Sequence, residues 1–263
     1  MDLQLDNKLA LVSGSTAGIG FAIAQALAAE GARVIVNGRT QKGVDAALAT
    51  LRESTGKAAI GFAGDLADAT VAETLVQRHP GIEILVNNLG IFEPKPFEEI
   101  PDDDWRRFFD VNVLSGARLA RLVLPAMRRA NWGRILFISS ESGIHIPAEM
   151  VHYGMTKAAQ IAVARGIAES VAGSGITVNS VLPGPTRSRG VGDFVEALAK
   201  DQNKSAPQVE KEFFEHVRPT SLIQRFATIE EVAAMVVYLS SPRASATTGS
   251  AVRVDGGTVK SAF

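Results

Sequence analysis

The sequence predicts an α/β fold built on one doubly wound parallel sheet of about seven strands, with helices on both faces. Short runs rich in β-branched residues alternate with longer Ala-, Leu- and Arg-rich segments of helical period. No Pro/Ser-rich linker, repeat or block of charge divides the 263 residues. We therefore expect a single domain over residues 1–263.

About seven segments have the length and composition of buried strands. They are Leu9–Ser13, Arg33–Val36, Ala58–Ala63, Ile84–Asn87, Arg134–Ser139, Thr177–Leu182 and Ala251–Val254. Segments of helical period separate them, among them Ile19–Glu30, Val44–Ser54, Trp105–Met127, Tyr153–Val171 and Glu230–Leu239. This alternation is typical of parallel strands joined by crossover helices.

The segment Arg187–Leu222, between the sixth expected strand and the last helix, is too long for a plain loop. Hydrophobic residues in its first half fall at helical spacing, namely Val191, Phe194, Val195 and Leu198. In its second half, Ser205 and Gln208 form a capping-box pattern before Val209 and Phe213. The pattern predicts two short helices here.

The amino-acid composition narrows the classes of partner that the chain is expected to bind. The formal net charge is −1, so no overall field favours nucleic-acid phosphates or an anionic membrane. Cysteine is absent, which removes disulfides and thiolate chemistry. The first six residues do not resemble a signal peptide, and no apolar stretch reaches the roughly 18 residues of a membrane span. We expect a cytoplasmic protein whose partners are small molecules and copies of itself.

The four histidines do not suggest a metal site, because none stands at i, i+4 spacing beside carboxylates. We expect His152 to be hydrogen-bonded locally, while His145 could contact a ligand. Asp102, Asp103 and Asp104 precede Trp105, and acids at a helix start are favoured by capping and the helix dipole. We therefore predict no metal ligands.

A glycine-rich turn follows the first expected strand and leads directly into an Ala-rich helix. Gly14 permits a tight turn, Gly18 lets the backbone approach a pyrophosphate, and Gly20 lets the helix pack closely on the strand. The helix that starts at Ile19 offers free N–H donors at its N-terminus. A plain strand-to-helix turn is the alternative, but this context favours a Rossmann-type dinucleotide site.

The end of the second expected strand predicts which dinucleotide binds. NAD-binding folds place an acid there for the ribose 2′-hydroxyl, and no acid is present. Gly38 stands at that place, and the Arg39 guanidinium suits a 2′-phosphate. Ser15 in the glycine-rich turn could add a hydroxyl donor. The sequence favours NADP(H), with NAD(H) possible and an ordinary solvated Arg39 as the alternative.

The spacing of Gly14, Gly18 and Gly20, G-x-x-x-G-x-G, resembles the short-chain dehydrogenase/reductase family. Further motifs match it in order along nearly the whole chain: Asn87-Asn88-Leu89-Gly90, Asn112 within V-N-V, Ile138-Ser139-Ser140, Tyr153-x-x-x-Lys157, Pro183-Gly184 and Val254-Asp255-Gly256-Gly257. Ser13 replaces the family's Thr, and Leu89 replaces its Ala. The glycine spacing resembles the dehydrogenase branch, and the chain is similar to 3-oxoacyl-acyl-carrier-protein reductases.

The resemblance implies an oxidoreductase that moves a hydride between a nicotinamide cofactor and a carbonyl or alcohol carbon. Tyr153 would act as general acid/base, and Lys157 with the positive nicotinamide ring would lower its pKa. Ser140 would hydrogen-bond the substrate oxygen. Lys157 would also hold the ribose hydroxyls. Asn112 would kink its helix and anchor a water that relays protons from Lys157.

The same resemblance assigns a wider set of cofactor-binding positions. They are Gly14, Ser15, Gly18, Ile19, Gly20, Gly38, Arg39, Asp65, Leu66, Asn88, Gly90, Tyr153, Lys157, Pro183, Gly184 and Thr186. Arg187–Leu222 would be a helical substrate lid, unless its side chains simply pack on the protein's own body.

The segment Tyr153–Val171 is apolar on nearly every side, so a partner subunit is expected to cover part of it in a dimer or tetramer. Neighbouring helices of the same chain are the alternative cover. Two further functions stay open: a non-catalytic protein that senses the cofactor on the same fold, and an epimerase or dehydratase of the extended branch.

Overall fold

The computed structural model describes residues 1–188, 191–192, 196, 199–201 and 204–262. Its main sheet has seven parallel strands in the order β3-β2-β1-β4-β5-β6-β9. The strands are β1 (Leu9–Val12), β2 (Arg33–Gly38), β3 (Ile60–Ala63), β4 (Ile84–Asn87), β5 (Gly133–Ile138), β6 (Ile176–Pro183) and β9 (Ala251–Val254). All the expected strands are present, and the predicted Rossmann-type fold is confirmed.

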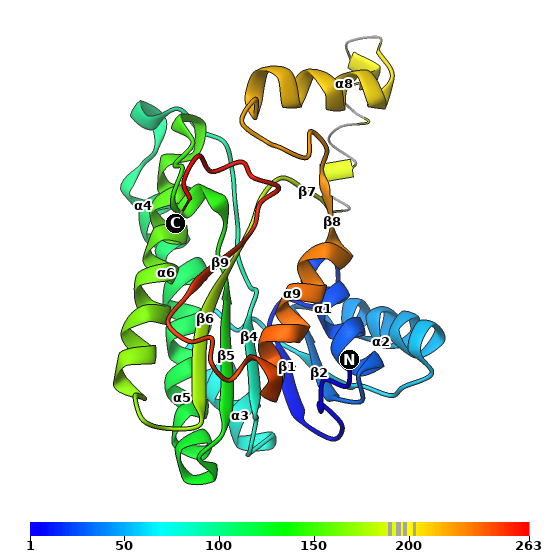
Figure 1. Cartoon of the computed structure of the whole chain (residues 1–263), viewed down its shortest axis with the longest axis vertical. Coiled ribbons are helices and arrows are strands. Elements are labelled where there is room, and N and C mark those ends of the chain that lie inside the picture. Colours follow the sequence, from blue (N-terminus) through cyan, green and yellow to red (C-terminus); the bar gives the residue numbers. More distant parts are fainter. Residues whose placement is uncertain (189–190, 193–195, 197–198, 202–203, 263) are drawn as a thin grey trace.

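Helices cover both faces of this sheet (Figure 1). One face carries α1 (Gly18–Ala29), α2 (Gln41–Thr55) and α9 (Ile229–Ser240). The other carries α3 (Ala69–Arg78), α5 (Ser115–Ala130) and α6 (Val151–Ser170). Neighbouring strand residues point to opposite faces, so Val12 packs in the first core cluster and Leu11 in the second. Burial on both faces explains the nearly continuous apolar strands.

The single helix expected over Trp105–Met127 is interrupted. It consists of α4 (Asp102–Phe109), a π-helical turn (Asp110–Leu114) and α5. Asn112 lies in that turn, fully buried, and its Nδ2 donates to Ile91 O at 3.0 Å and Thr156 Oγ1 at 2.9 Å. A π turn bends a helix, so the predicted distortion at Asn112 is confirmed.

The segment Arg187–Leu222 lies beyond the carboxyl end of β6 (Figure 1). Its predicted capping box is present at the start of α8 (Ala206–Glu212), and a π-helical turn (Phe213–Val217) follows. Phe194, Val195 and Leu198 lie outside the described residues. Two short strands, β7 (Thr186–Arg187) and β8 (Ala227–Thr228), pair beside this segment. These two strands were not predicted, because a two-residue strand is too short to show an alternating pattern in the sequence.

His152 corrects one expectation. Its side chain is completely buried, and neither ring nitrogen has a hydrogen-bond partner among the described residues. The ring packs instead 4.0 Å from Phe108 and 6.1 Å from Trp105, centroid to centroid. The start of α6 turns His152 toward the aromatic side chains of α4, and burial lowers its pKa.

Among the described residues, no helix is both long and apolar enough to cross a membrane.

Candidate active site

The glycine-rich turn and the end of β4 meet at the topological switch point, where the chain leaves β1 and β4 toward opposite faces. Gly14 and Gly18 have φ values of +61° and +57°, which only glycine adopts readily. A Cβ atom at Gly20 would lie 2.4 Å from Asn88 Nδ2. Asn88 Nδ2 donates to the carbonyls of Ser13 and Gly14, both at 3.0 Å. The two loops are thus held together.

Ser13 and Leu89, the two residues that depart from the family pattern, both fit their surroundings in the structure. The Ser13 hydroxyl accepts the backbone N–H groups of Asn88 and Leu89, both at 3.0 Å. Leu89 packs its side chain against the second core cluster. Ser13 therefore keeps the hydroxyl that the turn needs, and Leu89 contributes to the core.

The N-terminus of α1 fits a pyrophosphate. Its N-cap residue is Ala17, which makes no side-chain capping bond, and no acidic residue stands in the first turn. The first N–H groups of α1 are therefore free of side-chain caps, and no carboxylate there would repel a phosphate. This observation supports the phosphate role predicted for Gly18, Ile19 and Gly20.

The hydroxyl role predicted for Ser15 is wrong. Ser15 is completely buried, its hydroxyl donates to Val12 O at 2.7 Å, and the same oxygen accepts the Asn37 N–H at 2.9 Å. Its hydrogen is bound to the end of β1, and its oxygen holds the turn against β2. Thr16 lies nearer the end of β2, because a Cβ atom at Gly38 would meet Thr16 Cγ2 at 2.4 Å.

The residues predicted to hold the adenosine end lie around the end of β2. Arg39 is exposed and has no ion pair within the described part of the chain. Asp65 is exposed, whereas the Leu66 side chain is 1% exposed and belongs to the core, so only its backbone could reach a cofactor. The Asn37 side chain ties these loops together, donating to Phe62 O at 3.2 Å and Gly64 O at 3.0 Å.

A cavity of about 720 Å³ lies at the carboxyl ends of the strands. Predicted residues from five loops and helices line it: Ile19, Asn88, Gly90, Ser140, Tyr153, Lys157, Pro183, Gly184 and Thr186. The opposite wall comes largely from the segment predicted as a lid, with Val191, Val209, Phe213, Val217 and Arg218. Asn112, Asp65 and Arg39 are not part of this lining, and neither is the exposed His145.

The lid segment also has a small core of its own, in which Val209 and Phe214 pack with Phe226. The rings of Phe213 and Phe226 stack with centroids 5.1 Å apart. Some side chains of the segment therefore line the cavity, and others pack on the protein. Closure of the segment over a substrate stays a prediction.

Tyr153 and Lys157 lie one turn apart on α6 and both line the cavity. Burial raises the pKa of the Tyr153 phenol well above its ordinary value, and the negative charge of Glu141 raises it further. Hydrogen bonding by the Ser140 side chain lowers this pKa, but by less than burial raises it. Burial also lowers the pKa of Lys157 to about 7. The chain's own charges therefore do not produce the predicted fall in the Tyr153 pKa.

Gln160 bridges Lys157 and Asn112, the two residues between which a water relay was predicted. Lys157 Nζ donates to Gln160 Oε1 at 3.1 Å and to Ile138 O at 2.8 Å. Gln160 Nε2 in turn donates to the Asn112 carbonyl at 2.6 Å. An amide thus joins the two groups, and the water relay stays a prediction. The polar Gln160 within an otherwise apolar helical segment was the signal in the sequence.

Glu141 and Arg218 are the other site residues that sequence reasoning missed. Glu141 is 5% exposed, and its Oε2 accepts the Ser140 hydroxyl at 2.5 Å. Arg218 Nε lies 3.7 Å from Glu141 Oε1, and its Nη2 lies 3.5 Å from Glu149 Oε1. Only the fold brings Arg218 to Glu141, so nothing local in the sequence could have paired them.

Comparisons with known proteins identify the family. A family model described as enoyl-(acyl carrier protein) reductase matches residues 14–259. The chain is 34% identical over 263 residues to dehydrogenase/reductase SDR family member 4 of Bos taurus, covering 97% of this chain and 88% of that protein. The chain belongs to the short-chain dehydrogenase/reductase family.

Other members of the family are more similar in sequence or known in structure. An uncharacterized oxidoreductase of Bacillus subtilis (strain 168), YvaG, is 46% identical over 264 residues, and each chain is covered completely. L-sorbose reductase from Gluconobacter frateurii, solved in complex with NADPH and L-sorbose, superposes with a TM-score of 0.93 at 31% identity. That match covers 99% of this chain and all of the reductase. This short-chain dehydrogenase/reductase is therefore an oxidoreductase.

Proposed function

We propose that this short-chain dehydrogenase/reductase transfers a hydride between NADP(H) and a carbonyl or secondary alcohol substrate, with Tyr153 as general acid/base. One observation carries the proposal: Ser140, Tyr153 and Lys157 line the same cavity as Ile19, which lies between Gly18 and Gly20, and the Pro183-Gly184 loop. Ketones, aldehydes and 3-oxoacyl compounds are the substrate classes that suit this chemistry. The L-sorbose reductase complex with NADPH supports the choice of cofactor.

The bound cofactor supplies the hydride that the chain cannot provide. In reduction, Tyr153 donates its proton to the carbonyl oxygen, and Ser140 orients that oxygen and stabilises its developing charge. Lys157 holds the nicotinamide ribose and, together with the positive ring of the oxidised cofactor, stabilises the phenolate. Phe92, Met150 and Phe213 in the cavity lining favour a substrate with an apolar portion.

A kinetic screen tests the function. β-Ketoacyl thioesters, ketones, aldehydes, sugars and secondary alcohols are each assayed with both cofactors by the absorbance of the reduced nicotinamide. We expect turnover with at least one carbonyl class. Tight NADPH binding without turnover on any compound would instead favour a cofactor-sensing protein.

The end of β2 carries a prediction about cofactor choice. We expect a higher kcat/KM with NADP(H) than with NAD(H), because Arg39 is exposed and unpaired within the described residues. Arg39→Ala reduces that preference by roughly tenfold, the effect of losing one charged contact of about 1.4 kcal/mol. Gly38→Asp reverses it, but a Cβ atom there collides with Thr16 Cγ2. Thr16→Ala is therefore combined with Gly38→Asp, and Thr16→Ala alone is the control. Equal efficiency with both cofactors, unaffected by Arg39→Ala, would contradict the assignment.

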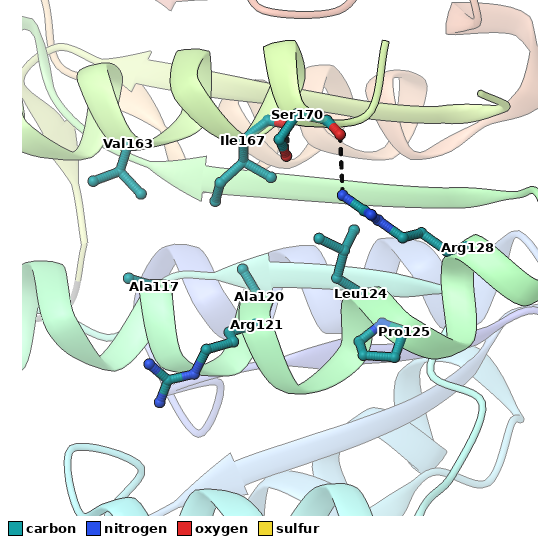
Figure 2. Close-up of a pocket in the computed structure, with 9 residues that line it drawn as sticks. All are labelled: Ala117, Ala120, Arg121, Leu124, Pro125, Arg128, Val163, Ile167 and Ser170. Carbon is teal, nitrogen blue, oxygen red and sulfur yellow. Dashed lines mark hydrogen bonds between the residues drawn. The ribbon is translucent and has the colours of Figure 1, made fainter. Parts of the chain in front are cut away.

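We also propose that a second copy of the chain packs on α5 and α6. Figure 2 shows Val163 and Ile167 of α6 facing Ala117, Ala120 and Leu124 of α5 across a shallow apolar groove. Gly166 lies beside Val163 and Ile167, and a Cβ atom there would meet no atom within 4 Å. An apolar helix pair with a glycine on its open side suits close packing of a partner helix.

Gly166→Gln tests this packing. Glutamine favours the helix over glycine by roughly 0.5–1 kcal/mol, so the subunit itself stays folded. In a dimer the added side chain blocks the partner, and we expect light scattering to show a lower mass than for the wild type. Ala46→Gln, on the exposed side of α2, is the matched control. A monomeric wild type would refute the proposal.

A further inference from the structure

Glu141 lies inside the active site, and no role assigned so far uses it. Its side chain is buried beside Ser140, Tyr153 and Lys157, and its Oε2 accepts the Ser140 hydroxyl at 2.5 Å. A buried carboxylate is costly unless it is paired and hydrogen-bonded. Arg218 supplies the opposite charge, 3.7 Å away. The fold thus maintains a carboxylate one hydrogen bond from a catalytic hydroxyl.

Gln160 lies between Lys157 and the Asn112 carbonyl, where the family resemblance implied a water that relays protons. Its amide accepts from Lys157 Nζ at 3.1 Å and donates to the Asn112 carbonyl at 2.6 Å. A side-chain amide keeps its two N–H hydrogens, so it connects these groups without passing a proton onward as a hydroxyl or water does. The Gln160 amide therefore supplies no proton to Tyr153.

We propose that Glu141 is a positioning residue that exchanges protons with Tyr153 through Ser140, and that Arg218 holds its carboxylate in place. The inference rests on the function proposed above. In reduction, the Tyr153 Oη–H bond breaks and a new O–H bond forms on the substrate. A buffer acid or water in the cavity then protonates the Glu141 carboxylate. As the phenolate takes the Ser140 hydroxyl hydrogen, Ser140 takes that proton from Glu141, which returns to the carboxylate, and oxidation runs the same steps in reverse.

The hydrogen bonds around Ser140 suit this exchange. The Ser142 backbone N–H donates to Ser140 Oγ at 3.1 Å, which leaves the single hydroxyl hydrogen for Glu141. Tyr153 lines the same cavity as Ser140, and hydrogen bonding by Ser140 lowers the pKa of its phenol against the effect of burial. Ser140 therefore stands between the phenol and the carboxylate as both donor and acceptor.

Arg218 connects the buried carboxylate to the cavity mouth. Its side chain is 13% exposed and reaches Glu141 on one side and the half-exposed Glu149 on the other. Charged and titratable groups facing Glu141 or sharing its cavity come from several elements: Arg218, Glu149, Tyr153, Lys157, Glu212 and His216. Of these, Arg218 is the cation that the structure pairs with Glu141.

Glu141→Gln in the full-length protein tests the proton exchange. Glutamine keeps the shape of the side chain, but it replaces the oxygen that carries the proton with an amide nitrogen. We expect the first NADPH in a stopped-flow trace to be oxidised within about threefold of the wild-type rate, because Tyr153 starts protonated. Later turnovers become at least about tenfold slower, as expected when a positioned acid is lost. The trace thus shows a burst of one NADPH per active site, and the slow phase accelerates with buffer-acid concentration.

Glu73→Gln is the matched control, because it makes the same exchange at an exposed position of α3 that does not line the cavity. We expect it to show no burst. Equal slowing of the first and later turnovers in Glu141→Gln, or no slowing at all, would overturn the exchange. A wild type that oxidises NADPH with no carbonyl compound would instead overturn the proposed function.

Arg218→Met keeps the test decisive should Glu141→Gln fail to fold. It leaves the carboxylate in place but removes the adjacent cation, so the pH profile of steady-state turnover moves to higher pH while the first turnover is retained. NADPH binding, measured by fluorescence, reports whether the variant is intact. An unchanged pH profile in a folded Arg218→Met protein would refute the role of Arg218.

Discussion

Tyr153→Phe lowers turnover by at least about 10²-fold, and by up to roughly 10⁴-fold, while NADPH affinity changes little. The substitution removes only the phenol oxygen, so the proton that the substrate oxygen needs is lost and the ring stays in place. Stopped-flow and steady-state rates give the catalytic loss, and fluorescence titration gives the affinity.

The chain provides a matched control for this experiment. It contains two tyrosines, and the second, Tyr238 on α9, is 38% exposed and does not line the cavity. Tyr238→Phe removes the same atom and leaves turnover at the wild-type level. A folded Tyr153→Phe protein with wild-type turnover would show that Tyr153 is not the general acid/base.

Lys157→Met has opposite effects on activity and stability. Burial lowers the pKa of Lys157 in the folded chain to about 7 from an ordinary value of 10.5. Between these values the unfolded chain binds the proton more strongly than the folded chain, so wild-type stability falls as the pH decreases from 10.5 toward 7. Removing the ammonium abolishes this cost.

We therefore expect Lys157→Met to melt at least about 3 °C above the wild type at neutral pH, and the difference to shrink toward pH 10.5. Turnover falls by at least about 100-fold, because the phenolate and the ribose lose their cationic partner. Thermal melts across the pH range and steady-state assays measure the two effects.

Lys42→Met is the control, because Lys42 is exposed on α2. It leaves both the melting temperature and turnover nearly unaltered. A Lys157→Met protein that melts below the wild type at neutral pH would mean that the buried ammonium stabilises the fold rather than destabilising it.

The sequence by itself predicted the sheet and its glycine-rich turn. Strands buried on both faces must be continuously apolar, and Gly14 and Gly18 adopt positive φ values that other residues avoid. These are local constraints, so they appear in the residues themselves. The same holds for the capping box at Ser205 and the family motifs around Ser140, Tyr153 and Lys157.

The tertiary structure decided which polar groups meet. Ser15 lost its expected role because its hydroxyl hydrogen goes to Val12 O while Asn37 of β2 donates to its oxygen, and His152 lost its expected partners because α4 covers it with aromatic rings. Arg218 and Glu141 are distant in sequence, as are Gln160 and the Asn112 carbonyl, yet each pair is in contact. Hydrogen bonds and ion pairs act over a few ångströms, so long-range partners follow from the packing of elements and not from spacing along the chain.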